Sequence, residues 1–330
     1  MAELTFRQAL GQAMAEEMEK DPDIFLMGEE VAKYDGAYKV TKGLLERFGP
    51  RRVWDSPISE NGFAGLAVGA AMAGLKPVVE MMTWNFGIQA FDQIVNHAAK
   101  LRYMSGGQFA MNMVFRGPNG NAHMLAAQHS QFYEPMITNV PGMLVVSPST
   151  PADGKGLLKA AIRENNPVIF LESEMMYAMK GEVPDEADYV IPLGQGDIKR
   201  PGEHVTLIAW SKVLHRVLQA AAELEKEGIS AEVVDPRTLQ PLDEELIFAS
   251  VRKTHRAVVV EESWGFASVG AQISDRIQRE CFDDLDAPVS RVCADFVHIP
   301  YNEAQEEAVF PDVEKIVQAA KGVLYMDGTR

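Results

Sequence analysis

The sequence has few cysteines and fewer cations than anions. Its two cysteines, Cys281 and Cys293, are too few for a disulfide framework and lack the spacing of zinc ligands, which indicates a reducing compartment such as the cytoplasm. The 31 Lys and Arg residues against 47 Asp and Glu residues leave a net charge of −16. Because nucleic-acid binding needs a basic face, this balance argues against a nucleic-acid partner.

The sequence also lacks a long uninterrupted apolar run. In the most apolar stretch, residues 61–82, Lys76-Pro77 interrupts the run after about fourteen residues, short of the roughly 20 that a membrane-spanning helix needs. The first residues, MAELTFRQALGQAMAEEMEKDPD, include acidic side chains and no apolar run, unlike a signal or transit peptide. We therefore expect no membrane association.

The signature motifs of several enzyme classes are missing too. The sequence has no GxxxxGK[ST], GxGxxG, HExxH or GxSxG motif in a fitting context. It therefore gives no support for a P-loop, dinucleotide-binding, zincin or α/β-hydrolase enzyme. Asp153-Gly154 and Asn165-Asn166 faintly resemble the GDG…NN element that holds magnesium and diphosphate in thiamine-diphosphate enzymes. Their spacing is too short, and Ala152 stands in place of the first glycine, so Asn165-Asn166 is better interpreted as a turn.

What the sequence does contain is an alternation of short apolar runs and helical patterns. Such runs predict strands at 24–27, 52–54, 78–82, 111–115, 143–147, 168–171, 205–210, 231–235 and 257–262. Thr5 with Gln8 predicts a capping box before the first helix, and Thr150 with Pro151 predicts another helix start. The alternation predicts an α/β fold of two domains, each a mostly parallel sheet with helices on both faces. The polar, proline-containing stretch 181–204 is expected to link a first domain, 1–180, to a second, 205–330.

One carboxylate stands at the start of a segment built of small residues. In SPISENGFAGLAVGAAMAGLKPVVE, residues 56–80, Glu60 precedes a helical pattern so rich in Gly and Ala that another backbone could approach it closely. Taken alone, Glu60 is either a ligand-binding group or an acidic helix-start residue favoured by the helix dipole by about 0.3–1 kcal/mol.

Seven segments, in order, resemble the beta subunits of the pyruvate dehydrogenase component of 2-oxo acid dehydrogenase complexes, and the resemblance runs from about residue 3 to about residue 320. They are GEEVAKYDGAYKVTKGL (28–44), DSPISENGFAGLAVGAAMAGLKPVVE (55–80), QAFDQIVNHAAKLRYMSGG (89–107), FRGPNG (115–120), AAQHSQ (126–131), AIRENNP (161–167) and VDPRTLQPLD (234–243). The resemblance implies a thiamine-diphosphate pyrimidine-binding domain followed by a transketolase C-terminal-like domain.

The resemblance also implies an activity and its partners. It implies oxidative decarboxylation of pyruvate and transfer of the acetyl group to lipoyl groups of a dihydrolipoyl acyltransferase core. The beta chain would pair with an alpha subunit, two of each, and thiamine diphosphate would lie between them, with Mg²⁺ and the diphosphate held by the alpha subunit. A branched-chain 2-oxo acid or acetoin dehydrogenase beta subunit, a transketolase-like half enzyme and a non-catalytic scaffold stay open as alternatives. Phe86, in place of a tyrosine, favours pyruvate.

The resemblance makes four residues candidates for the cofactor site. Glu60 matches the glutamate that bonds to a nitrogen of the aminopyrimidine ring and favours its imino tautomer. Phe86 matches the aromatic residue that stacks on this ring, and Gln89 either lines the same pocket or faces solvent. Glu29 either belongs to an acidic passage between active sites or is a polar residue at a strand end.

Two further expectations follow from the resemblance. His129, in AAQHSQ, would position the reaction intermediate or the incoming lipoyl group, and its near-neutral reference pKa suits proton transfer; His123 in the same loop is a weaker candidate. The backbone around five residues matches a potassium site of relatives: Met113, Ala161, Ile162, Glu164 and Asn166. The final residues LYMDGTR, 324–330, depart from the family's usual end, which bears on docking to the acyltransferase core.

Overall fold

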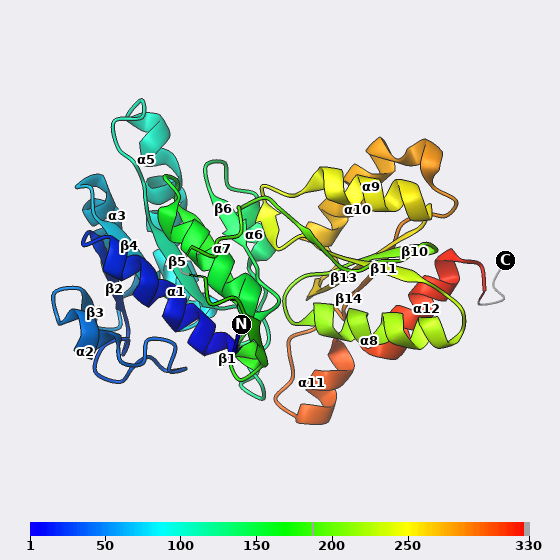
Figure 1. Ribbon diagram of the computed structural model, residues 1–330, viewed down its shortest axis with the longest axis horizontal. Helices are drawn as coiled ribbons and strands as arrows, with labels where there is room; N and C mark the ends of the chain where they lie inside the picture. The colour runs from blue at the N-terminus through cyan, green and yellow to red at the C-terminus, as the bar shows by residue number, and fades with distance from the viewer. Residues whose placement is uncertain (187, 327–330) are drawn as a thin grey trace. The chain divides into compact units, whose positions relative to one another are not determined.

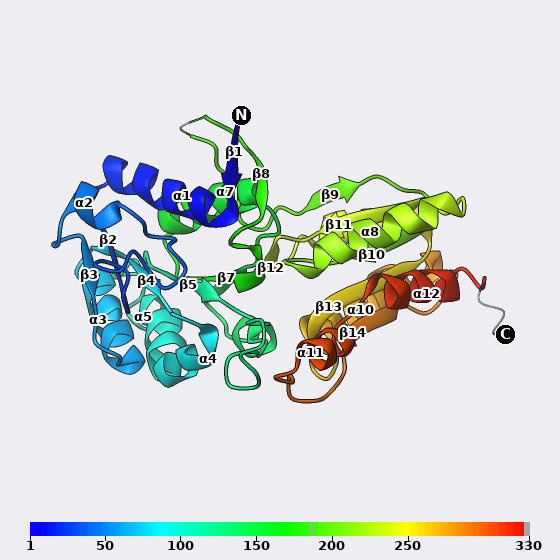
Figure 2. The same ribbon diagram turned by 90° about the horizontal axis from the view of Figure 1, so that it is seen from below.

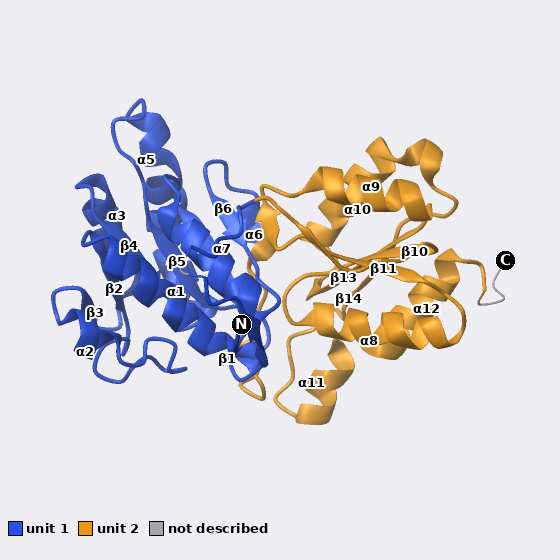
Figure 3. Cartoon of the chain, in the orientation of Figure 1, with its two compact units in different colours: residues 1–122, 136–193 blue, residues 123–135, 194–330 orange. Residues whose placement is uncertain are grey.

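The computed structural model describes residues 1–186 and 188–326 (Figure 1), so the last four residues of LYMDGTR lie outside the described residues. The chain divides into two compact units, residues 1–122 with 136–193 and residues 123–135 with 194–330 (Figure 3). The segment 123–135, which contains His129, therefore packs with the second unit although it lies within the sequence of the first. The domain boundaries at 180 and 204 stay predictions; the stretch between them includes the end of one strand and the whole of another.

The first unit is organised around a parallel sheet. Its strands, in spatial order, are β6 (Leu144–Val146), β7 (Val168–Glu172), β5 (Val114–Pro118), β4 (Lys76–Glu80), β2 (Ile24–Gly28) and β3 (Val53–Asp55). All of these neighbours pair in parallel. Every residue of β2, β5 and β7 is buried, as expected for strands covered on both faces.

Helices cover both faces of this sheet (Figure 2). On one face α1 (Phe6–Lys20) packs along α7 (Pro151–Arg163), and on the other α3 (Glu60–Met72) packs against the π-helical turn η2 (Gln93–Ala98), which continues into α5 (Ala99–Met104). The remaining elements are short: β1 (Ala2–Thr5), which pairs antiparallel with β8 (Lys180–Val183), α2 (Leu44–Phe48), α4 (Trp84–Gly87), η1 (Ile88–Ala90), α6 (Glu134–Thr138) and η3 (Glu174–Met176).

The second unit repeats this plan with a smaller sheet. Its strand order is β14 (Ser290–Ala294), β13 (Ala257–Trp264), β10 (Val205–Ile208), β11 (Ala231–Asp235) and β9 (Asp197–Arg200), and only β9 pairs antiparallel. Figure 1 shows α8 (Val213–Lys226) and α12 (Val313–Val323) on one face, and α9 (Glu244–Thr254) and α10 (Val269–Glu280) on the other. The unit also contains β12 (Thr238–Gln240), η4 (Phe282–Asp284) and α11 (Glu303–Val309). The predicted α/β class is confirmed.

The two predicted helix starts are confirmed, whereas one predicted strand begins later than expected. Thr5 and Gln8 form the expected capping box, and the Thr150 side chain accepts from the N–H of Asp153, with Pro151 at the first helical position. The strand expected at 111–115 begins only at Val114; Asn112 lies in the preceding loop, where its side-chain amide donates to the Glu164 carbonyl oxygen at 2.8 Å. No helix within the described ranges combines the length and the apolar character that crossing a membrane requires.

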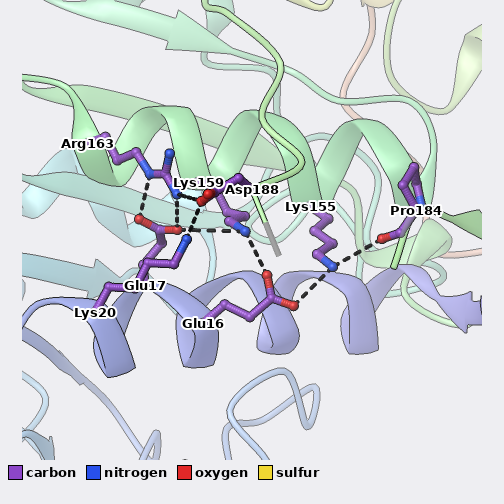
Figure 4. A network of polar contacts seen from close by, with 8 residues as sticks. All are labelled: Glu16, Glu17, Lys20, Lys155, Lys159, Arg163, Pro184 and Asp188. Carbon is purple, nitrogen blue, oxygen red and sulfur yellow. Dashed lines mark hydrogen bonds and ion pairs between the residues drawn. The ribbon is translucent and has the colours of Figure 1, made fainter. Parts of the chain in front are cut away.

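A network of buried charges joins α1 to α7 (Figure 4). The side chains of Lys155 and Lys159 are 0% exposed. Lys155 Nζ lies 3.0 Å from one carboxylate oxygen of Glu16, and Lys159 Nζ lies 2.6 Å from the other. Arg163 donates to both oxygens of Glu17, at 2.7 Å each. Because each buried cation faces a carboxylate, the network fixes how the two helices pack.

The lysines also change the acidity of Glu16. Burial alone would raise the pKa of its carboxyl, but hydrogen bonds from Lys159 and Lys155 hold that pKa below its ordinary value. Since the folded pKa lies below the unfolded one, Glu16 stabilises the fold above its unfolded pKa. This stabilisation is lost as the pH falls through the folded pKa.

We expect Glu16→Gln to lower the free energy of unfolding by about 3 kcal/mol or more, because it leaves the buried Lys155 and Lys159 without a full countercharge. Glu19→Gln is the matched control: Glu19 lies on the same helix, half-exposed, and pairs with the half-exposed Arg47, so its loss should cost less than about 1 kcal/mol. Thermal and urea unfolding of the two variants measure the difference. Equal, small losses would contradict a structural role for the network.

Candidate active site

The carboxyl ends of β2 and β3 bring two acidic side chains together. Glu29 directly follows β2, and Glu60 is the first residue of α3, after β3. Only 7% of Glu29 and 6% of Glu60 is exposed. In parallel sheets, ligands commonly bind at this edge, beyond the carboxyl ends of the strands. The structure thus brings together two residues that were predicted at separate points of the sequence.

Glycine at the end of β2 allows this arrangement. A Cβ atom at Gly28 would stand 2.7 Å from the carbonyl oxygen of Glu80, the last residue of β4, closer than any side chain tolerates. The two strand ends therefore approach closely, and the chain turns from Gly28 into the site with Glu29 as its next residue. Any larger residue at position 28 would push these strands apart.

The acidity of Glu29 reports its surroundings. Burial, and then the nearby charge of Glu60, raise the pKa of Glu29 from its ordinary 4.5 to about 7. Among the described residues, neither Oε1 of Glu29 nor the hydroxyl of Ser56, which follows β3, has a hydrogen-bond partner. Buried polar atoms without partners are costly and uncommon, so these atoms are suited to a polar ligand. A carboxyl that titrates near neutral pH is also typical of sites that move protons.

The two predicted pocket residues after β4 lie in short helical turns. Phe86 is half-buried in α4, and Gln89 is exposed in η1, which packs against α3 and thus against the helix that Glu60 begins. A Cβ at Gly87 would stand 2.7 Å from the Trp84 ring, so this turn also depends on a glycine. A half-buried aromatic side chain can offer a flat face to a ring, and the stacking role of Phe86 stays a prediction.

His129 belongs to the other unit. It is half-buried in the segment 123–135, and its backbone N–H donates to the Ala126 carbonyl at 3.2 Å. His123, in the same segment, lies with its Nδ1 3.9 Å from a carboxylate oxygen of Glu306. The roles predicted for both histidines stay predictions.

The residues expected around potassium gather at the end of α7. Ala161 and Ile162 are in its last turn, and the Glu164 carboxylate then accepts from the backbone N–H groups of Asn165 and Asn166 at 2.8 and 3.1 Å. Met113, expected in the same site, precedes β5, and its carbonyl oxygen accepts from the N–H of Val168. Within the described ranges, no cluster of three or more His, Cys, Asp or Glu side chains is arranged to hold a metal ion.

The sequence interpretation missed a buried group of ion pairs at the carboxyl ends of the same sheet's central strands. Arg116 of β5 is 0% exposed and forms ion pairs with Glu80, at the end of β4, and Glu172, at the end of β7. The hydroxyl of Tyr177 donates to Glu172 at 2.6 Å. The available signal was a charged residue ending or interrupting each apolar strand, in PVVE, VFRGP and VIFLE.

Comparisons with known proteins agree on one family. The model for "Transketolase, pyrimidine binding domain" matches residues 2–180, and that for "Transketolase, C-terminal domain" matches residues 194–316. The chain is 52% identical over 325 residues to "Pyruvate dehydrogenase E1 component subunit beta" of Rhizobium meliloti, covering 98% of this chain and 71% of the relative. The chain belongs to this family. The Rickettsia felis member is 52% identical over 98% of this chain and 99% of its own length, and the mitochondrial member of Caenorhabditis elegans is 51% identical over 96% and 92%.

A solved structure supports the fold of this family member. "Split gene transketolase, inactive beta4 tetramer" superposes with a TM-score of 0.79 at 24% identity, covering 98% of this chain and 99% of that chain. At this identity the likeness concerns the fold alone. The family resemblance and the transketolase-like, two-domain α/β fold are both confirmed.

The raised pKa of Glu29 predicts a pH dependence of stability. Because the folded chain holds this proton more tightly than the unfolded chain, stability should fall as the pH rises from about 4.5 to about 7. Glu29→Gln should remove that fall. The thermal midpoint of the variant minus that of the unsubstituted protein should therefore increase across this pH window and level off above it. Glu30→Gln, at the exposed neighbouring position, should follow the unsubstituted profile. Parallel profiles for all three proteins would contradict the assignment.

Proposed function

We propose that the chain is the beta subunit of a heterotetrameric, thiamine-diphosphate-dependent 2-oxo acid dehydrogenase that oxidatively decarboxylates pyruvate. Its acetyl product passes to lipoyl groups of a dihydrolipoyl acyltransferase. Family membership supports the class of reaction, and relatives at about half identity across nearly the whole chain carry the pyruvate dehydrogenase name. The single structural observation behind the proposal is the buried pair Glu29 and Glu60, at the carboxyl edge of the sheet.

The site residues suit the aminopyrimidine half of the cofactor. Bound thiamine diphosphate supplies the carbon nucleophile and the electron sink that decarboxylation requires. The carboxyl of Glu60 would bond to a ring nitrogen and share a proton with it, Phe86 would present its flat face to the ring, and Gln89 would line the pocket. The unpartnered Oε1 of Glu29 leaves a buried acceptor in the same place.

Burial explains why the carboxyl group of Glu60 suits a bond to the aminopyrimidine ring. Only 6% of Glu60 is exposed, so its carboxyl can bond to a ring nitrogen of the cofactor with little competition from water. Glu29 adds a second carboxyl whose pKa of about 7 lets it hold or release a proton near neutral pH. Glu29 can therefore exchange a proton beside the bound ring, as acid–base catalysis needs.

We assign the diphosphate and Mg²⁺ to an alpha subunit, because the GDG…NN element does not occur at its proper spacing in this sequence. Large apolar side chains on the α3 and α5 side of the first unit support a protein partner there. Leu66 is 51% exposed, Tyr103 87% and Met104 74%. Exposed apolar surface of this kind is typical of subunit interfaces.

His129 is assigned to acetyl transfer, where its imidazole would position the acyl group or the lipoyl thiol.

Reconstitution with an alpha subunit tests this function. We expect pyruvate to be decarboxylated with a kcat/KM at least about tenfold higher than that of 3-methyl-2-oxobutanoate, whose branched chain adds bulk to the pocket. Glu60→Gln should lower turnover by about 10² or more, since it removes the shared proton, while the assembly stays intact by size. Glu46→Gln, on the exposed face of α2, is the control.

Each other result selects an alternative. Preference for the branched substrate would indicate a branched-chain dehydrogenase, and turnover of ketose phosphates without a lipoyl acceptor would indicate a transketolase-like enzyme. Full turnover by Glu60→Gln in an intact assembly would contradict the catalytic role and favour a scaffold.

We also propose a potassium ion at the end of α7, held by backbone carbonyl oxygens around Met113, Ala161, Ile162, Glu164 and Asn166. The last carbonyls of a helix lack helical partners and lie at the negative end of its dipole, which suits a hard cation. The oxygens of this loop already attract a cationic group, because Asn165 O and Asn166 Oδ1 accept from Arg102 Nη1 at 2.9 and 2.8 Å. We expect a higher thermal midpoint in potassium chloride than in tetramethylammonium chloride at equal ionic strength. Equal midpoints would exclude the site.

A further inference from the structure

The segment that contains His129 is held in an unfavourable backbone conformation. Met124 and Ala126 adopt φ values of 58° and 62°, in the left-handed region that residues with side chains seldom occupy. The chain around them forms turns without helix or strand, and Met124 and Leu125 are 36% and 46% exposed. Such a conformation persists only where surrounding contacts enforce it.

One contact is a buried carboxylate at the start of the segment. The backbone N–H of Met124 donates to both carboxylate oxygens of Glu306, at 3.2 and 3.1 Å. Glu306 is only 3% exposed, and His123 Nδ1 lies 3.9 Å from its Oε2. A charged acceptor makes a stronger hydrogen bond than a neutral one, so Glu306 fixes the backbone at a left-handed residue.

The second contact lies on the other side of His129. Phe132 is 5% exposed and makes edge-to-face contacts with Phe310, at 6.0 Å between ring centroids, and with Trp264, at 6.2 Å. Phe310 directly follows α11, and Glu306 lies within it. Glu306, within α11, and Phe310, directly after it, therefore hold the segment at residues 124 and 132, and His129 lies between these two points in the sequence.

We propose that Glu306 is a positioning residue for His129. By holding the N–H of Met124, its carboxylate fixes one end of the short segment whose other end is fixed by Phe132, and the imidazole between them is placed for acetyl transfer. This inference rests on the acetyl-transfer role proposed for His129. Glu306 acts through the backbone and does not itself take part in the reaction. It should therefore affect acetyl transfer and leave decarboxylation, which precedes that step, largely unchanged.

The test uses the reconstituted alpha–beta assembly and three variants. Glu306→Leu removes the acceptor, and Glu306→Gln keeps a carbonyl oxygen for the Met124 N–H. Glu307→Gln changes the adjacent residue, whose exposed carboxylate pairs with Arg216 instead. Decarboxylation is measured with an artificial electron acceptor, and acetyl transfer is measured with a free lipoyl domain. Hydrogen exchange at the amides of residues 124–131 measures the order of the segment, and His129→Ala is assayed alongside.

We expect Glu306→Leu to lower kcat for acetyl transfer by about tenfold or more, with decarboxylation within about twofold, because small misplacements of reacting groups are costly. Glu306→Gln should fall between Glu306→Leu and the unsubstituted protein, and Glu307→Gln should match the latter. The Met124 amide should exchange at least about tenfold more slowly in the unsubstituted protein than in Glu306→Leu. If Glu306→Leu does not fold, the test uses two other measurements. These are acetyl transfer by Glu306→Gln and slow exchange of the Met124 amide in the unsubstituted protein.

Several results would overturn the inference. Undiminished acetyl transfer in Glu306→Leu, or unprotected exchange at Met124, would remove the link to His129. A parallel loss of both reactions and of the thermal midpoint would give Glu306 a general structural role only. If His129→Ala transfers acetyl groups normally, the role proposed for His129 fails, and this inference with it. Loss in His129→Ala without loss in Glu306→Leu overturns this inference alone.

Discussion

The end of the sheet that carries the candidate site depends on one buried guanidinium group. Arg116 is enclosed between Glu80 and Glu172, so it joins the carboxyl ends of three neighbouring strands, β4, β5 and β7. Burying three charges is expensive, and the group keeps one more carboxylate than cations. Burial accordingly raises the pKa of Glu80, although Arg116 opposes the shift. These ion pairs hold the carboxyl ends of the strands in place. The Glu80 backbone lies against Gly28, and Glu29 is the next residue after Gly28.

This end of the sheet explains how a chain with many ordinary carboxylates can hold two buried, interacting carboxyl groups. Neither Glu29 nor Glu60 stands out in a sequence with 47 acidic residues. They become unusual when the sheet buries both and brings their charges close enough to interact. The acidity of the site is thus a property of the strand ends, and it responds to anything that moves them.

Local signals in the sequence predicted the elements, and long-range packing decided the rest. Thr5 with Gln8, and Thr150 with Pro151, act within one helical turn, so their helix starts could be predicted. The attachment of residues 123–135 to the second unit could not, because it depends on Glu306 and Phe310, far along the chain. Glu60 was found through a family resemblance, whereas the partnerless oxygen of Glu29 requires coordinates. Arg116 escaped notice because its two countercharges come from separate strands.

The buried lysines between α1 and α7 have a chemical consequence. An amine can be acylated only when a reagent reaches its lone pair, and Lys155 and Lys159 have no exposed surface and are bonded to Glu16. Amine-labelling reagents therefore reach these two positions only when the helices separate, whereas exposed lysines such as Lys42 react in the folded chain. Mass spectrometry of labelled protein would thus record opening of this unit as modification at two chosen sites, in a mixture with any number of other proteins.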